Sequence, residues 1–181
     1  AKSEASIYSL ITAEEKIAQI DTKLIGNPSS IVYFPDGRTM AVATDSGIYF
    51  LEVKKYRPYA KIENVPFTAT SMSVSSNGYY LAATDGKKIA VYNIEERSLR
   101  KLFDEGTVVN GMLFSPDSSD FAVLTNDGLL NIYSTRTFEF RKMVDDLGEA
   151  IAGAYNLDGK YMAVVTSPSA CLLYTSPSPR D

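Results

Sequence analysis

The sequence repeats a set of turn and strand markers with a period of about 40 residues, a length typical of repeat architectures. Turn-forming residues recur at this period, at Asp36, Asn77, Asp117 and Asp158. The threonines that end the following expected strand recur in step with them, at Thr44, Thr84, Thr125 and Thr166. A third marker follows the same spacing, at Leu51, Tyr92 and Tyr133. Because the three markers share one period, each unit is predicted to form the same supersecondary structure.

Four short strands in a unit of about 40 residues are typical of the blades of a β-propeller. We therefore predict an all-β fold, a partial β-propeller with about three full four-stranded blades and two incomplete ones. The full blades are expected at residues 30–70, 71–109 and 110–150, and the partial blades at residues 1–29 and 151–170.

The composition of the turns and strands supports this interpretation. Pro35 presets a turn and Gly37 can adopt a positive φ, so the two residues place the first turn. The strand Met40–Ala43 is almost entirely small and apolar, which favours burial on both faces. The recurring turn aspartates are interpreted as Asx turns, in which the carboxylate accepts hydrogen bonds from nearby backbone, rather than as catalytic acids or bases.

The two ends of the chain require separate interpretations. At the start, residues 12–20 could form a short helix with a Thr12 and Glu15 capping box, but the repeat register favours a turn followed by a strand over Lys16–Ile20. At the other end, residues 171–181 fit no blade and resemble translated sequencing-adapter sequence, so we expect a non-native tail. Since the chain also begins without Met, we expect a piece of a longer protein.

Without that tail the net charge stays at −4 and no cysteine remains, because the only one is Cys171. The lack of cysteine slightly favours the cytoplasm over export. Mild acidity argues against a nucleic-acid partner, and no apolar run is long enough to cross a bilayer.

The motifs Phe34-Pro35-Asp36-Gly37, Phe114-Ser115-Pro116-Asp117 and Val91-Tyr92-Asn93-Ile94 resemble WD40-type repeats. The resemblance implies a β-propeller that binds proteins or peptides. The sequence contains no His and no Trp, so the Gly-His and Trp-Asp pairs of such repeats are absent. Leu51-Glu52, Tyr92-Asn93 and Tyr133-Ser134 occupy the Trp-Asp place, and the side-chain relay of typical members cannot form.

No catalytic constellation is expected. Without His or a native Cys, the chain cannot build a Ser-His-Asp or Cys-His nucleophile pair or an ordinary zinc site, and it has no phosphate-binding glycine loop. We therefore expect no enzyme activity, no cofactor and no metal in these residues.

One segment suggests a binding site. Lys54–Tyr59 is interpreted as a long basic connection into an outer strand at Ala60–Glu63, and it places cationic residues next to tyrosines. Tyrosine and arginine are frequent anchors of protein contacts, so the candidate partner-binding residues are Tyr56, Arg57 and Tyr59. The alternative is a solvated loop whose tyrosines cover the edge of the blade.

Two functions remain open from the sequence. The first is a non-catalytic scaffold that binds an unidentified protein or peptide through its loop faces. The second is the propeller portion of a larger enzyme or sensor. In either case an open arc of blades should expose apolar surface at its ends, so residues 1–170 are expected to be poorly soluble or oligomeric.

Overall fold

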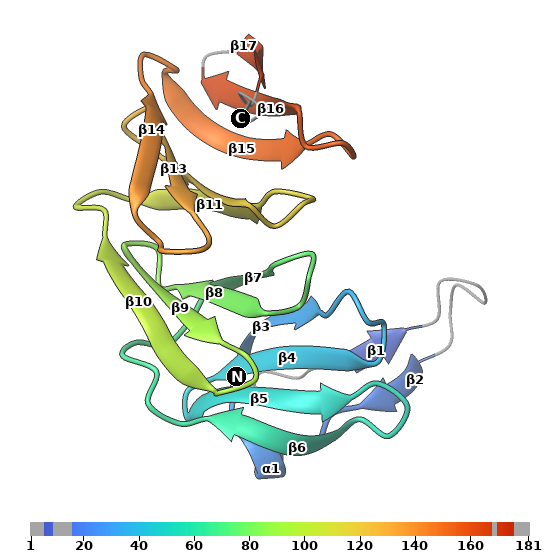
Figure 1. Cartoon of the computed structure of the whole chain (residues 1–181). Helices are drawn as coiled ribbons and strands as arrows, with labels where there is room; N and C mark the ends of the chain where they lie inside the picture. Colours follow the sequence, from blue (N-terminus) through green and yellow to red (C-terminus); the bar gives the residue numbers. More distant parts are fainter. Residues whose placement is uncertain (1–5, 9–15, 168–169, 176–181) are drawn as a thin grey trace.

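Most described residues of the computed structural model lie in antiparallel β-strands or in the turns and loops that connect them (Figure 1). The described residues are 6–8, 16–167 and 170–175. Sheet I comprises β3 (Pro28–Tyr33), β4 (Thr39–Thr44), β5 (Gly47–Glu52) and β6 (Arg57–Ile62). Sheet II comprises β7 (Ser71–Val74), β8 (Tyr80–Thr84), β9 (Lys88–Asn93) and β10 (Ser98–Asp104). Sheet III comprises β11 (Val109–Phe114), β12 (Asp120–Thr125), β13 (Leu130–Ser134) and β14 (Phe140–Val144). Sheet IV comprises β15 (Glu149–Tyr155), β16 (Tyr161–Ser167) and β17 (Ala170–Thr175).

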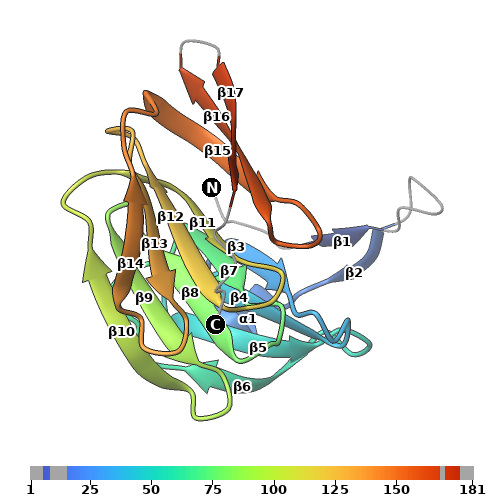
Figure 2. The same ribbon diagram turned by 45° about the horizontal axis from the view of Figure 1, so that its top comes forward.

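Within each sheet the strands pair in chain order, and the sheets follow one another in an open arc. The first strands of the sheets, β3, β7, β11 and β15, are neighbours along the inside of the arc. The last strands of the four-stranded sheets, β6, β10 and β14, lie at the periphery (Figure 2). The predicted all-β fold, a partial β-propeller, is confirmed.

The apolar cores lie between successive sheets rather than inside any one of them. One cluster joins sheets I and II through Phe50 and Tyr92, and a second joins sheets II and III through Phe103 and Phe121. A third joins sheets III and IV through Leu124. Because the second strands are covered on both faces, all six residues of β12 are buried, and Met40–Ala43 of β4 are completely buried, as the sequence predicts.

The repeating turn residues form the predicted Asx turns. Asp36 Oδ1 accepts hydrogen bonds from the backbone N–H groups of Arg38 and Thr39, at 2.8 and 2.9 Å. Partial burial acts to raise the pKa of Asp36, but these hydrogen bonds outweigh it and hold the pKa below its usual value. The same side-chain contact to the backbone two residues on recurs in the other units, at Asn77, Asp117 and Asp158.

The segment before sheet I contains an antiparallel pair, β1 (Ser6–Tyr8) and β2 (Lys16–Gln19), and a short helix, α1 (Thr22–Ile25). The alternative of a helix over residues 12–20 is wrong for residues 16–19, which pair with β1; residues 12–15 lie outside the described residues. Helix α1 was not predicted. Its signal is Asp21, whose side chain caps the helix by accepting a hydrogen bond from the Lys23 N–H, and Gly26, which ends it with a φ of 89°.

Sheet IV includes residues that were expected to lie outside any blade. β17 pairs with β16 along its length, with Ala163 opposite Leu173, so the expectation that the last eleven residues fit no blade is wrong for residues 171–175. The run Cys171-Leu172-Leu173-Tyr174 is apolar and ends in an aromatic residue, and such a run can form an edge strand whatever its origin. The adapter origin of the segment stays a prediction.

Candidate functional site

Tyr56 and Arg57 lie where the chain turns from β5 into β6. The Tyr56 N–H donates to the Glu52 carbonyl at 2.7 Å, and its φ of 52° closes the turn. The Tyr56 ring is half-buried and packs in the cluster that contains Leu51 and Ile20. Arg57, by contrast, is exposed and begins β6.

The predicted boundary between connection and strand is therefore wrong. β6 begins at Arg57, so Arg57 and Tyr59 are strand residues rather than loop residues. Pro58, which has no N–H to donate, is also a strand residue. In the structure β6 is the edge strand of sheet I, where a missing N–H on the outer side leaves no partner unsatisfied.

A groove of about 630 Å³ lies beside Tyr56 and Arg57. Three separate segments line it: the end of β2 with Asp21, helix α1, and the turn into β6; the lining residues are Gln19, Asp21, Leu24, Lys55, Tyr56, Arg57 and Pro58. Its apolar wall includes Leu24, whose side chain is 60% exposed. The groove thus combines apolar contact area with charged groups at one edge.

The charges of the groove are not equivalent. Lys55 Nζ lies 3.1 Å from the Glu52 carboxylate, and the Asp21 carboxylate is occupied in capping α1. Arg57 forms no ion pair with any residue in the described part of the chain. Arg57 is therefore the cation best placed to receive an anionic group of a bound partner.

Tyr59 does not join the other two candidate residues. It is 62% exposed and lines a separate hollow of about 330 Å³ between sheets I and II, together with Phe50, Ala60, Ile94, Glu95 and Arg97. The pairing of β5 with β6 shifts register between Phe50 and Leu51, opposite Tyr59, so this residue sits in a β-bulge. The bulge interrupts the alternation of β6. The Tyr59 side chain therefore lies on the opposite face of the sheet from the one that regular alternation would give it.

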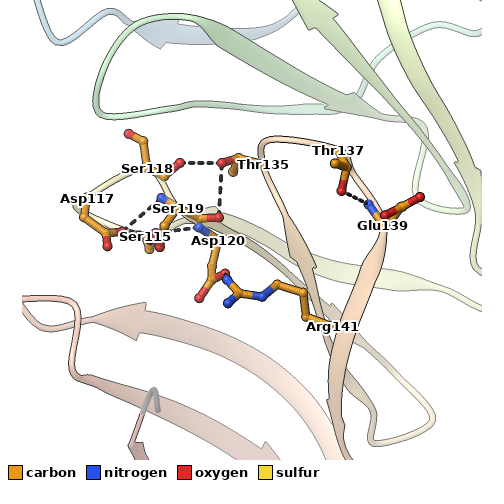
Figure 3. Close-up of polar contacts among 9 residues, drawn as sticks. All are labelled: Ser115, Asp117, Ser118, Ser119, Asp120, Thr135, Thr137, Glu139 and Arg141. Carbon is orange, nitrogen blue, oxygen red and sulfur yellow. Dashed lines mark hydrogen bonds and ion pairs between the residues drawn. The ribbon is translucent and has the colours of Figure 1, made fainter. Parts of the chain in front are cut away.

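The same bulge recurs in the next two sheets, at Arg100 and Arg141, which occupy the equivalent places in β10 and β14. Figure 3 shows its effect in sheet III, where Arg141 reaches back to form an ion pair with Asp120 at the start of β12. In sheet I the Tyr59 hydroxyl lies 3.5 Å from Oγ1 of Thr39, which occupies the corresponding position at the start of β4. The bulge residue therefore has a structural contact in sheet III and only a long, exposed one in sheet I.

Other polar contacts take the place of the side-chain relay that the sequence cannot form. Asn27 Nδ2 donates to Asp45 Oδ2 at 2.7 Å, which joins the chain before β3 to the turn after β4. In sheet III, Asn126 stands in the place of Asp45, and its Oδ1 accepts from Thr107 Oγ1 at 2.5 Å and from the N–H of Val108, the counterpart of Asn27, at 3.3 Å. These ties hold the loops at one end of each of the two sheets without His or Trp.

Two inner-strand residues hydrogen-bond from one sheet to the next. Ser29 Oγ donates to the Ala69 carbonyl at 2.6 Å, and Asn110 Nδ2 donates to the Ala150 carbonyl at 2.7 Å. Both residues occupy the register shift of the first strand pair. The bulges thus aim polar side chains across the junctions between sheets.

The described residues contain no group of three or more His, Cys, Asp or Glu that could hold a metal ion. They also contain no helix long and apolar enough to span a bilayer. The polar clusters that are present, such as the one in Figure 3, connect turns and strands of the same sheet.

Antiparallel sheets that pack face to face in an open arc define the class: part of a β-propeller. No protein-family model matches the chain. Its sequence is similar to a BTB/POZ domain and WD-repeat protein of Acanthamoeba polyphaga mimivirus, at 22% identity over 76% of this chain and 27% of that protein. It is also similar to pre-mRNA-processing factor 19 from two organisms. The Dictyostelium discoideum protein matches at 25% identity over 60% of this chain and 22% of that protein. The protein from Oryza sativa subsp. japonica matches at 27% identity over 84% of this chain and 31% of that protein. The chain spans less than a third of the length of each of these relatives.

Solved structures support the fold. The β-propeller domain of Cps50 (Swd1) from Myceliophteria thermophila matches with a TM-score of 0.71 at 14% identity, over 83% of this chain and 54% of that one. Hydrazine synthase of Kuenenia stuttgartiensis matches with a TM-score of 0.68 at 18% identity, over 78% of this chain and 43% of that one. The chain is therefore similar to WD-repeat proteins in sequence and to β-propellers in structure.

Proposed function

We propose that the chain is part of a non-catalytic β-propeller scaffold that binds another protein or a peptide, with the groove beside Tyr56 and Arg57 as one binding site. The similarity to WD-repeat proteins supports the general role. The observation that carries the site is the groove itself, which joins an apolar wall to an arginine that has no ion pair in the described part of the chain.

The chemistry of the groove suggests what it binds. Leu24, Tyr56 and Pro58 offer apolar contact, and Arg57 offers a planar pair of donors for a carboxylate. A peptide that carries an acidic residue next to a large apolar residue fits both features. Because β6 is an edge strand, an extended peptide along it would reach Tyr59 in the neighbouring hollow as well.

A displayed library of random peptides tests the proposal. The chain is expected to select peptides with an acidic residue beside a large apolar one, and the double variant Arg57→Glu with Tyr59→Ala is expected to bind the selected peptides at least about tenfold more weakly, or about 1.4 kcal/mol. Tyr56 is left unchanged because its ring packs on Leu51, so its loss would also affect stability.

The matched control is the double variant Arg100→Glu with Tyr79→Ala, which changes an exposed arginine of β10 and an exposed tyrosine in the turn before β8. It should keep full affinity, and both double variants should melt at the temperature of the unmodified chain. Selected peptides that bind the Arg57 and Tyr59 variant with unchanged affinity, or a library that yields no binder, would contradict the site.

A second function is the propeller portion of a larger enzyme or sensor. The structural likeness to hydrazine synthase favours keeping this alternative, although fold alone does not establish activity. Sequencing the uninterrupted reading frame of the source transcript distinguishes the two: a catalytic domain beside the repeats supports the second function, and further repeats alone support the scaffold.

A further inference from the structure

Asparagine precedes glycine at two places in the sequence, Asn77-Gly78 in the turn between β7 and β8 and Asn110-Gly111 in β11. In such a pair the backbone nitrogen of the glycine can attack the side-chain amide of the asparagine, because glycine has no Cβ to shield its nitrogen. The reaction expels ammonia and leaves aspartate or isoaspartate. The surroundings of the two pairs decide which of them can react in the folded protein.

The Asn110-Gly111 pair is restrained at both residues. Asn110 Nδ2 donates a hydrogen bond to the Ala150 carbonyl at 2.7 Å, so the nitrogen that would leave is held across the junction between sheets III and IV. A Cβ added to Gly111 would lie 3.2 Å from Leu124 Cδ1, so this glycine is packed against a neighbouring side chain. Reaction at Asn110 would have to break the hydrogen bond and move the strand.

The Asn77-Gly78 pair has neither restraint. Asn77 is exposed, and its Nδ2 has no hydrogen-bond partner among the described residues, because the printed contacts of its side chain all go to Oδ1. A Cβ added to Gly78 would meet no heavy atom within 4 Å. The leaving nitrogen is therefore free, and the space around the attacking residue is open.

Hydrogen bonds in this turn act on the reaction in two opposite ways. Asn77 Oδ1 accepts from Ser75 Oγ at 2.7 Å and from the Tyr79 N–H at 3.0 Å. Attack on Cγ places negative charge on this oxygen, so the two donors stabilise the intermediate. The Gly78 N–H, however, donates to the Ser75 carbonyl at 2.8 Å, and this bond must open before the nitrogen can attack. Asn77 should therefore react more slowly in the folded chain than in the unfolded chain, but faster than Asn110.

We propose that Asn77-Gly78 is a site of spontaneous deamidation in the folded protein. The Gly78 nitrogen forms a bond to Asn77 Cγ and the Cγ–Nδ2 bond breaks, so that Nδ2 leaves as ammonia with the proton that Gly78 loses. Water then opens the cyclic succinimide at one of its two carbonyl carbons, which gives aspartate or isoaspartate without any change of oxidation state. This inference goes beyond the proposed binding function and does not depend on the groove.

The two products should affect the fold differently. Aspartate is the residue at the corresponding position of the other turns, where the carboxylates of Asp36, Asp117 and Asp158 accept the same backbone hydrogen bond. Isoaspartate instead adds a carbon to the backbone of the turn. This change should displace the Asn77 N–H from Ser118 Oγ, which lies 2.9 Å away in the turn of sheet III. The isoaspartate form should therefore lose a contact between sheets II and III.

Peptide mapping by mass spectrometry tests the proposal on the whole chain, incubated at mildly alkaline pH either folded or in concentrated urea. In the folded chain Asn77 is expected to convert at least about tenfold faster than Asn110, because only Asn110 is held by the neighbouring sheet. In urea the two rates should agree within about threefold, since both pairs then have the same local chemistry. Fragment ions assign each conversion to its residue and separate aspartate from isoaspartate.

Two matched variants separate the sites. Asn77→Ser should lose most of the acidic species that ion exchange resolves in the aged folded chain, whereas Asn110→Ser should keep them. Of the two species separated from the unmodified chain, the isoaspartate form should melt at a lower temperature than the aspartate form. An Asn110 that converts as fast as Asn77 in the folded chain, or an Asn77 that stays intact in the folded chain while it converts in urea, would overturn the proposal.

Discussion

At the scale of single residues, the least favourable buried polar group among the described residues is the hydroxyl of Tyr92. Its side chain is 1% exposed and packs between sheets I and II, and its hydroxyl has no hydrogen-bond partner among the described residues. Burial of an unpartnered polar group costs about 1–3 kcal/mol. The ring is thus favourable at this position while the hydroxyl is not.

We expect Tyr92→Phe to raise the free energy of unfolding by about 1 kcal/mol, because it removes the unpartnered hydroxyl and keeps the ring. Urea denaturation at neutral pH measures the difference. A variant that is less stable than the unmodified chain would show that the hydroxyl has a partner in solution.

The pH dependence provides the control for this prediction. Burial raises the pKa of Tyr92 to about 12, above its value of about 10 in the unfolded chain. Since the folded state holds the proton more tightly, stability is complete below pH 10 and falls as the pH rises towards 12. Tyr92→Phe should lose less stability over this range. Some loss should remain, because burial and then Glu105 also raise the pKa of Tyr133.

At the scale of the strand, the recurring bulge of the outer strands has different consequences in different sheets. In sheet III the bulge residue Arg141 pairs with Asp120, whose side chain is only 13% exposed. In sheet II the equivalent Arg100 forms no ion pair within the described residues. The same backbone irregularity therefore supports a half-buried ion pair in one blade and an exposed arginine in the next.

We expect Arg141→Met to lower the free energy of unfolding by about 1 kcal/mol, because Asp120 would remain largely buried without its cation; the value allows for the partial exposure of Arg141. Arg100→Met is the matched control and should change stability by less than about 0.5 kcal/mol. Chemical denaturation of both variants measures the difference. Equal effects at the two sites would mean that the ion pair contributes nothing beyond the apolar stem of the arginine.

At the scale of the whole molecule, each sheet is stabilised by its neighbours, as in other repeat proteins. Sheets II and III are packed on both faces, whereas in sheet IV Val165 of β16, which alternates with the buried Met162 and Val164, is 47% exposed. Stability should therefore decrease towards sheet IV, and local opening should begin there.

Hydrogen exchange in the unmodified chain tests this gradient. We expect backbone amides of β16 to exchange at least tenfold faster than those of β12, which corresponds to about 1.4 kcal/mol of local stability. Equal protection of the two strands would show that the arc unfolds as one cooperative unit.

The sequence by itself determined the repeat, the turns and the class of fold, because these depend on local chemistry. Asp36 forms the expected turn since its carboxylate reaches the N–H groups of Arg38 and Thr39, two and three residues away. Met40–Ala43 are buried on both sides since an apolar run with no polar face has no other stable environment. Both contacts and burial follow from residues close together in the chain.

Only the tertiary structure decided which candidate residues share a site. Tyr56 and Arg57 meet Leu24 in one groove because β2, α1 and β6 come together there, while a bulge turns Tyr59 into a different hollow. The burial of Ile20 against Met40 and the exposure of Val165 likewise depend on which sheets lie next to one another. Local sequence determines which segments form turns and strands, but the packing of distant segments decides which residues each side chain contacts.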